Sequence, residues 1–178
     1  MSDSPFFTVV IPNFNHGRYL KDAIDSVLNQ DYKKWELLII DNYSTDNSDE
    51  VISSYNDSRI RVFKIKNEGI IAKSRNLGIK NAQAKWIAFL DSDDIWYFNK
   101  LSRLIELTDD NFDIICSNEY RHDLEEGIRK PLYYNLKSNN FYKELLLKGN
   151  ALSTSATIVS RGFLNKNKLG FSENLDFI

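Results

Sequence analysis

Residues 86–94 have the sequence WIAFLDSDD, a short apolar run that ends in a cluster of aspartates. A run of four to eight apolar residues bounded by polar ones is typical of a buried strand. Two earlier runs end in a similar way: residues 6–11 precede PNFNHG, where Pro12 ends the strand, and residues 36–40 precede DNYSTD, which begins at Asp41. The sequence therefore predicts three buried strands, each followed directly by polar side chains.

Segments with helical spacing of apolar residues separate these strands. Residues 49–55 and 71–82 are predicted helices, the second weakened by Gly78, and residues 60–65 and 112–116 are predicted strands. Two more helices are predicted from apolar stripes with helical spacing: Leu20, Ala23, Ile24, Val27 and Leu28 in the first, and Phe98, Leu101, Leu104 and Ile105 in the second.

The alternation of strands and helices indicates the fold class. Repeated strand–helix–strand units favour parallel pairing through right-handed crossovers, with helices on both faces of the sheet. After residue 117 the pattern weakens: residues 118–136 are a hairpin or an active-site flap, residues 141–147 a helix and residues 156–159 a late strand. We predict one doubly wound α/β domain over residues 1–178, with a mostly parallel central sheet.

Composition narrows the class of protein. The 178 residues carry a formal net charge of −2, which argues against a nucleic-acid binder. Hydrophobic residues make up 42% of the chain, too many for a disordered protein. The single cysteine, Cys116, excludes an internal disulfide and favours a reducing, cytoplasmic setting. We expect no targeting signal and no transmembrane segment, and peripheral attachment to a membrane stays compatible with the sequence.

The DSDD cluster is the sharpest chemical signal. In an extended segment Asp91 and Asp93 project to the same side, where two carboxylates repel each other unless a cation lies between them. Hard oxygen ligands favour Mg²⁺ or Mn²⁺, which complete their shells with phosphates and water. A solvated turn that caps the following helix is the structural alternative.

Three other residues near the strand ends each allow two interpretations. Asp41 either caps a turn or accepts hydrogen bonds from a nucleotide. Phe14 is a core aromatic or a platform on which a base stacks. Arg75 pairs with a surface carboxylate or reaches a phosphate.

In a parallel sheet the three strand exits lie on one edge, where ligands bind. The dinucleotide fingerprint, the P-loop and the GxSxG elbow are absent from the sequence.

Together these motifs resemble the N-terminal half of a family 2 glycosyltransferase with the GT-A fold. The resemblance covers about residues 7–96 and rests on FTVVIPNFNHGRYLKDAIDSVLNQDYKKWELLIIDNYSTDNS and NEGIIAKSRNLGIKNAQAKWIAFLDSDDIW, in the family's order and spacing. A weaker match to the acceptor-side segment follows in residues 149–175. It implies a donor half at about residues 6–116 and an incomplete acceptor half at about residues 117–178.

The resemblance implies a site for a nucleotide-diphosphate sugar, most often one with uridine. Asp41 would recognise the edge of the nucleobase. The other residues expected around the nucleoside and its diphosphate are Pro12, Phe14, Asn15, Asn67, Gly69 and Arg75.

The resemblance also implies a metal-dependent, inverting glycosyl transfer. Asp91 and Asp93 match the DXD element, with Asp93 the direct ligand of Mg²⁺ or Mn²⁺ and Asp91 nearer the ribose or a metal-bound water; Ser92 between them is expected to contact the donor. The acceptor would be a hydroxyl of a saccharide or a lipid-linked molecule in polysaccharide or glycoconjugate synthesis.

The sequence departs from the family pattern in two places. Relatives often have Asp-Asp-Gly-Ser where this chain has Asp41-Asn42-Tyr43-Ser44, and Tyr43 in the glycine slot is expected to alter the turn. The base in relatives is the Asp of an acidic pair that we expect beyond Ile178. Neither Glu173 nor Asp176 matches that pair, so no catalytic residue is assigned.

Three other functions fit parts of the pattern. A nucleotidyltransferase also uses paired carboxylates on a metal, but usually has a glycine-rich phosphate loop after its first strand. A non-catalytic nucleotide-sugar sensor or partner subunit needs no base. A receiver-like signalling domain needs a late-strand lysine, for which the sequence offers no candidate.

Overall fold

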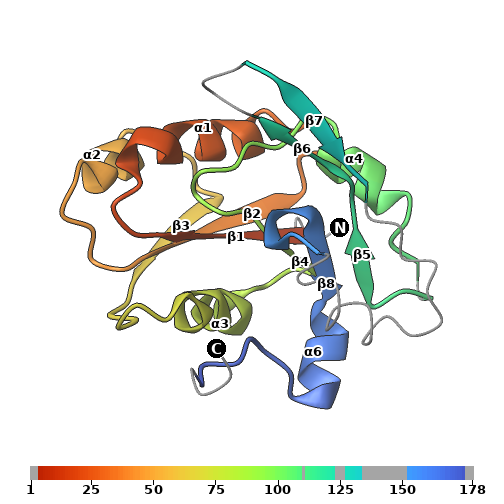
Figure 1. Ribbon diagram of the computed structural model, residues 1–178. Helices are drawn as coiled ribbons and strands as arrows, with labels where there is room; N and C mark the ends of the chain where they lie inside the picture. The colour runs from red at the N-terminus through yellow and green to blue at the C-terminus, as the bar shows by residue number, and fades with distance from the viewer. Residues whose placement is uncertain (1–3, 110, 123–126, 134–151, 175–178) are drawn as a thin grey trace.

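A computed structural model describes residues 4–109, 111–122, 127–133 and 152–174 of the chain (Figure 1). Six strands form the central sheet in the order β3-β2-β1-β4-β8-β5. Their bounds are Phe7–Asn13 (β1), Trp35–Asp41 (β2), Ile60–Lys64 (β3), Trp86–Phe89 (β4), Ile114–Cys116 (β5) and Thr157–Ser160 (β8).

The first four strands run parallel and confirm the predicted mostly parallel sheet. β8 runs antiparallel to its neighbours β4 and β5. The late strand therefore lies inside the sheet rather than at its edge, and it carries the residues before it, 152–156, to the place where β4 ends.

Helices cover both faces of the sheet, as predicted (Figure 1). One core cluster joins the sheet to α1 (Gly17–Leu28), α2 (Ser48–Ser53) and α4 (Lys100–Ile105). A second cluster joins the other face to α3 (Ile71–Asn81) and α6 (Arg161–Asn167). Side chains of alternate β1 residues enter the two clusters, Val9 the first and Val10 the second, as the period of a strand requires.

Gly78 has a packing role in α3. A Cβ atom at this position would lie 2.4 Å from Cγ1 of Val10, in the middle of β1. The glycine that weakens the helix by propensity therefore lets α3 approach the sheet closely.

Pro12 lies inside β1, so the prediction that it ends the strand is wrong. β1 pairs with β2 along its whole length, whereas its pairing with β4 stops at Val10 and Phe89. The carbonyl of Val10 accepts a hydrogen bond from Leu90 N–H, so the backbone of Val10 faces β4. Pro12, two residues on, faces the same side beyond the end of β4, and its missing N–H costs no sheet hydrogen bond.

Phe98 lies outside α4, so the prediction that it belongs to the apolar stripe of this helix is wrong. The helix begins at Lys100, and the Phe98 side chain is 64% exposed. Buried Gln30 fixes this start, because its side chain donates to the Tyr97 carbonyl and accepts from Leu101 N–H.

The segment after β5 forms the hairpin that was one of its two predicted structures. β6 (Glu119–His122) pairs antiparallel with β7 (Arg129–Leu132). A 3₁₀ turn, η1 (Thr154–Ala156), leads into β8. The helix predicted at residues 141–147 lies outside the described residues, and the division into donor and acceptor halves stays a prediction. No helix in the described ranges has the length and apolar character to cross a bilayer.

Candidate functional site

The three polar clusters converge at one edge of the sheet. The Asn13 carbonyl accepts a hydrogen bond of 2.9 Å from Asn42 N–H, and this bond joins the exits of β1 and β2. His16 Nδ1 lies 2.9 Å from Ser92 Oγ, which joins the exits of β1 and β4. The prediction that these clusters lie together at the carboxyl ends of parallel strands is confirmed by these contacts.

Asp41 is fully buried and holds the first part of this edge together. Its carboxylate accepts hydrogen bonds from Asn13 Nδ2 (2.8 Å), from the hydroxyl (2.6 Å) and backbone N–H (3.0 Å) of Ser44, and from Lys64 Nζ (2.9 Å). Burial alone would raise the pKa of Asp41, but the hydrogen bonds from Ser44, Lys64 and Asn13 outweigh it and hold the pKa below its usual value. A nucleobase that reaches Asp41 has to replace at least one of these donors.

The turns around Asp41 have left-handed backbone conformations. Asn15 has φ 53° and Tyr43 φ 51°. Tyr43 thus adopts a backbone conformation that glycine tolerates best and that other residues rarely adopt. Side chains brace the two turns against each other, because Ser44 Oγ accepts from Asn15 N–H at 2.9 Å and Asn15 Oδ1 accepts from Thr45 N–H at 2.7 Å.

Phe14 projects from this braced turn into solvent. Its side chain is 53% exposed, so the interpretation as a core aromatic is wrong. An exposed ring on a fixed turn is a suitable stacking surface for a planar group.

Asn67 and Gly69 shape the segment that leads into α3. Buried Asn67 accepts from Gly69 N–H with its side-chain oxygen and donates to Ser74 Oγ, both at 2.9 Å. Its own N–H donates to Asn42 Oδ1, which ties this segment to the exit of β2. Gly69 has φ 81°, and a Cβ there would meet no atom within 4 Å, so its role is conformational.

Arg75 points from α3 to the aspartate cluster. Its Nη2 donates to Asp91 Oδ1 at 2.8 Å, and its guanidinium carbon lies 5.3 Å from the centre of the Phe171 ring. The Nε atom is buried and has no hydrogen-bond partner among the described residues. The carboxylate partner of Arg75 is therefore a member of the predicted site, not an unrelated surface residue.

The DSDD turn is open to solvent on one side and crowded with negative charge. Asp91 is half-buried, whereas Asp93 and Asp94 are exposed. Desolvation raises the pKa of Asp94, and the charges of Asp93, Asp91 and Glu119 add to this rise. α4 begins only at Lys100, and the side chain that accepts from its first turn is that of Gln30, so the interpretation of DSDD as a helix cap is wrong.

The chemistry of these donors fits a divalent cation that brings other ligands with it. The described residues contain no group of three or more His, Cys, Asp or Glu side chains able to hold a metal by themselves. Asp91 and Asp93 supply carboxylates from one turn, and one oxygen of Asp91 is already bound by Arg75. Mg²⁺ and Mn²⁺ commonly bind one or two carboxylates and take phosphate and water for the remaining positions.

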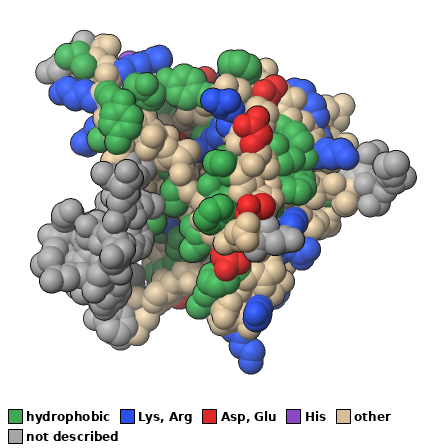
Figure 2. Space-filling model, turned by 90° about the vertical axis from the view of Figure 1, so that its right-hand side faces the viewer, with side chains coloured by type: hydrophobic (Ala, Val, Ile, Leu, Met, Phe, Trp, Pro, Cys, Tyr) green, Lys and Arg blue, Asp and Glu red, His purple; other side chains and the backbone are tan. Residues whose placement is uncertain are grey.

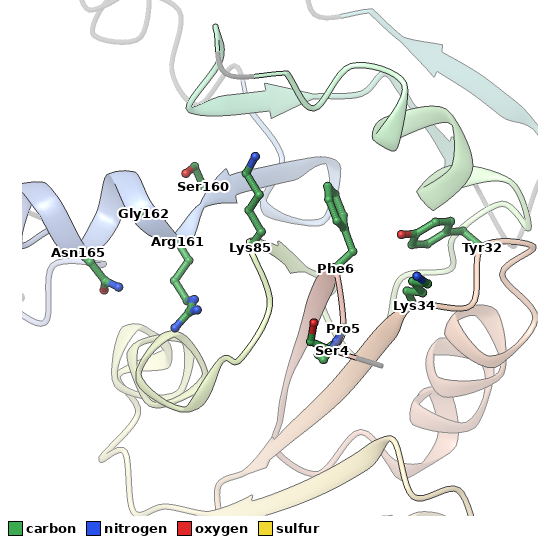
Figure 3. Close-up of a pocket in the computed structure, with 10 residues that line it drawn as sticks. All are labelled: Ser4, Pro5, Phe6, Tyr32, Lys34, Lys85, Ser160, Arg161, Gly162 and Asn165. Carbon is green, nitrogen blue, oxygen red and sulfur yellow. The ribbon is translucent and has the colours of Figure 1, made fainter. Parts of the chain in front are cut away.

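A cavity of about 600 Å³ lies at the opposite edge of the sheet and contains none of the predicted site residues. Phe6, Lys34 and Lys85, which line it, each precede a parallel strand (Figure 3). Arg161, also in the lining, donates to the carbonyls of Ala84 and Gln83 and so ties α6 to the start of β4. On this side of the molecule Lys and Arg side chains are scattered among hydrophobic ones (Figure 2).

Several residues that sequence reasoning missed hold the site together. Lys64 reaches Asp41 because the two residues are register partners at the ends of β3 and β2. A prediction that included the end of the third strand would have found it. Ser155, by contrast, lies far along the chain from the strand exits, and no sequence pattern near these exits points to it.

A comparison with known protein families shows to which family the chain belongs. A profile described as "Glycosyl transferase family 2" matches residues 8–166. This chain belongs to glycosyltransferase family 2. The expected family is therefore confirmed, and the receiver and nucleotidyltransferase interpretations are not supported.

Two bacterial glycosyltransferases are similar to this chain in sequence. An uncharacterized glycosyltransferase of Rickettsia felis is 46% identical over 121 residues, which are 67% of this chain and 20% of that protein. The Escherichia coli UDP-Glc:alpha-D-GlcNAc-diphosphoundecaprenol beta-1,3-glucosyltransferase WfgD is 38% identical over 105 residues, 59% of this chain and 42% of that protein. The chain thus spans less than half the length of these two relatives.

Solved structures confirm the GT-A-like fold of the domain. Staphylococcus aureus TarS 1–349 in complex with UDP-GlcNAc has a TM-score of 0.76 over 94% of this chain and 48% of that chain, at 23% identity. The mannosyltransferase PcManGT of Pyrobaculum calidifontis, in complex with GDP-Man and Mn²⁺, has a TM-score of 0.70 over 96% of this chain and 48% of that chain, at 18% identity.

Proposed function

We propose that this family 2 domain binds a nucleotide-diphosphate sugar, with uridine the favoured nucleoside, for transfer of the sugar to a hydroxyl acceptor. The observation that carries the proposal is the convergence of the three strand-end clusters on one edge of the sheet. The names of WfgD and of the TarS complex, both with UDP-sugars, support uridine, whereas the PcManGT complex holds a guanosine donor.

The nucleoside would bind between the two braced turns. Phe14 offers an exposed ring for the base, and Pro12 and Asn15 fix the turn that carries it. The Oδ1 atom of Asn13 is buried beside Asp41 without a partner among the described residues, so it is an additional acceptor there. Asp41 would recognise the edge of the base after a shift of Ser44 or Lys64.

The diphosphate would lie between α3 and the DSDD turn. Arg75 reaches this place with its guanidinium, and a phosphate can replace Asp91 as its partner because a phosphate also offers a pair of oxygen acceptors. Asn67 and Gly69 would shape the backbone beneath it, and Ser92 would contact the donor.

Mg²⁺ or Mn²⁺ would be held by Asp93 and Asp91, and when bound it supplies positive charge to the departing diphosphate. We infer an inverting transfer, in which an acceptor hydroxyl attacks the anomeric carbon from the face opposite the diphosphate. A carboxylate has to take the hydroxyl proton. Glu173 is hydrogen-bonded to Asn76, and we assign this role to no described residue. A saccharide or a lipid-linked acceptor is favoured, as the name of WfgD indicates for that protein.

Calorimetric titration with UDP, in MnCl₂ and in EDTA, tests the proposal. We expect UDP to bind in both and more tightly with Mn²⁺, and GDP to bind more weakly than UDP. An Asp93→Asn variant should lose the benefit of Mn²⁺, whereas Asp22→Asn, an equal charge change on an exposed residue of α1, should keep it. Absence of binding to any nucleoside diphosphate would contradict the proposal. Donor binding without turnover in the full-length protein would instead indicate a nucleotide-sugar sensor.

A further inference from the structure

Ser155 connects the acceptor-side segment to the DSDD turn. Its hydroxyl oxygen accepts a hydrogen bond of 2.9 Å from the backbone N–H of Asp91. Its carbonyl accepts from Nε1 of Trp96 at 3.0 Å. One buried residue of η1 thus contacts the first residue of the turn and the segment that follows the turn.

Both hydrogen-bond partners of Ser155 lie far from it in the sequence. Asp91 is 64 and Trp96 59 positions away, so no local turn geometry provides the same contacts. Within the turn itself the backbone makes one hydrogen bond, from Asp94 N–H to the Asp91 carbonyl.

The surroundings keep Ser155 in place. Next to it, the Ala156 carbonyl accepts from Ser117 N–H at 2.9 Å, which ties η1 to the exit of β5. Lys100 donates to Ser117 Oγ at 2.7 Å, and its ammonium lies 5.1 Å from the centre of the Trp96 ring. The support of the turn therefore continues into the sheet and into α4.

We propose that Ser155 is a positioning residue that fixes the Asp91–Asp94 turn in the geometry in which its carboxylates bind the metal–diphosphate unit of the donor. This inference rests on the proposed function. It adds that the acceptor-side segment takes part in donor binding. Because coupling between two sites is reciprocal, donor binding should in turn stabilise the segment around Ser155.

A positioning role and a purely structural role of Ser155 predict different effects on UDP binding. Loss of the Ser155 hydroxyl should weaken only the part of donor binding that depends on the metal. Asp41 and Ser155 share no hydrogen-bond partner among the described residues. A residue that served only the fold would affect binding equally with and without metal.

The test compares Ser155→Ala with Ser153→Ala, a matched control in the same turn whose side chain makes no capping hydrogen bond. UDP is titrated into each protein in MnCl₂ and in EDTA, and the ratio of the two affinities is the metal enhancement. We expect this ratio to fall about tenfold or more in Ser155→Ala, as for other groups that orient metal ligands, and to stay at the wild-type value in Ser153→Ala. Affinity in EDTA should be unchanged in both.

Hydrogen exchange provides the second readout. The Asp91 amide should exchange faster in Ser155→Ala, and UDP with Mn²⁺ should slow exchange around Ser155 in the wild type. If Ser155→Ala fails to fold, Ser155→Cys keeps the volume with weaker hydrogen bonds, and its enhancement should fall about threefold. A wild-type enhancement in the folded variants, or an equal loss with and without metal, would overturn this inference alone. A wild type that binds no UDP would overturn the proposed function with it.

Discussion

The two acidic parts of the site are built in opposite ways. The Asp41 carboxylate is buried and surrounded by donors of its own chain, and its pKa is lowered. The Asp91–Asp94 turn is largely exposed, and the pKa of Asp94 is raised by desolvation and by neighbouring negative charge. The first part is thus electrostatically complete, whereas a cation would stabilise the second. The comparison separates residues that keep the pocket in shape from residues that hold a charged ligand.

The largest effect is expected at Asp41. Asp41→Ala leaves Asn13, Ser44 and Lys64 without their common acceptor and should lower the free energy of unfolding by about 3 kcal/mol or more, as for other broken buried ion pairs. Urea unfolding followed by circular dichroism measures it. Asp49→Asn is the control, because exposed Asp49 binds the same Lys64. Equal stability of the two variants would remove the distinction between the two acidic parts.

Asp93 should show the opposite behaviour. Asp93→Asn is expected to lower Mn²⁺-dependent UDP affinity by about 10- to 100-fold without loss of stability. The pKa of Asp94 should fall toward its usual value, because the charge of Asp93 contributes to its rise. Calorimetry and the NMR titration of the Asp94 carboxyl carbon measure the two effects. An unfolding free energy reduced as much as in Asp41→Ala would contradict this prediction.

Substitution of Arg75 should change the affinities for the metal and for the nucleotide in opposite directions. In Arg75→Gln the Asp91 carboxylate loses its positive partner, so Mn²⁺ alone should bind a few-fold more tightly, while UDP should bind about tenfold more weakly. Lys73→Gln is the control: Lys73 lies on the same helix as Arg75 and pairs with Glu68, which precedes the helix, and its loss should change neither affinity. Loss of both affinities together would show that Arg75 merely supports the turn.

The smallest effect concerns the pH dependence of stability. The pKa of Asp41 is lower in the folded than in the unfolded chain. Its contribution to the free energy of unfolding is therefore complete above the unfolded pKa of about 3.9 and is lost as pH falls through the folded pKa. For Asp94 the folded pKa is raised, so its carboxylate destabilises the fold above that pKa and the penalty disappears on acidification. Asp94→Asn should therefore be more stable than the wild type at pH 7, by less than about 1 kcal/mol, and not in acid. Unfolding curves between pH 3 and 7 show whether acidification removes a stabilising contribution of Asp41 and a destabilising one of Asp94.

Much of the sheet could be predicted from the sequence, because its parallel strands are continuous apolar runs. The convergence of the strand exits followed from parallel pairing alone. The boundaries of two elements could not be predicted, because they depend on distant partners: Pro12 extends β1 where β4 has already ended, and Gln30 sets the start of α4 after Phe98.

The site could be predicted only where it lies next to a strand end. Asp41, Asp91 and Asp93 were found because acids after apolar runs stand out in the sequence. One of the hydrogen bonds to the Asp41 carboxylate comes from Lys64 of β3, and the support of the DSDD turn comes from Ser155. These contacts arise from tertiary packing, which leaves no periodic pattern in the sequence. The predicted roles of the individual site residues stay predictions.

Paramagnetic NMR tests the central claim most directly, namely that the metal–diphosphate unit binds at the DSDD turn. Mn²⁺ and UDP are added to the ¹⁵N-labelled chain, and the broadening of each backbone amide signal is recorded. We expect broadening around Asp91–Asp94 and Ser155 that requires Asp93, with sharp signals at Lys34 and Lys85 on the opposite edge of the sheet. Broadening at that opposite edge, or none at the turn in the presence of UDP, would contradict this claim.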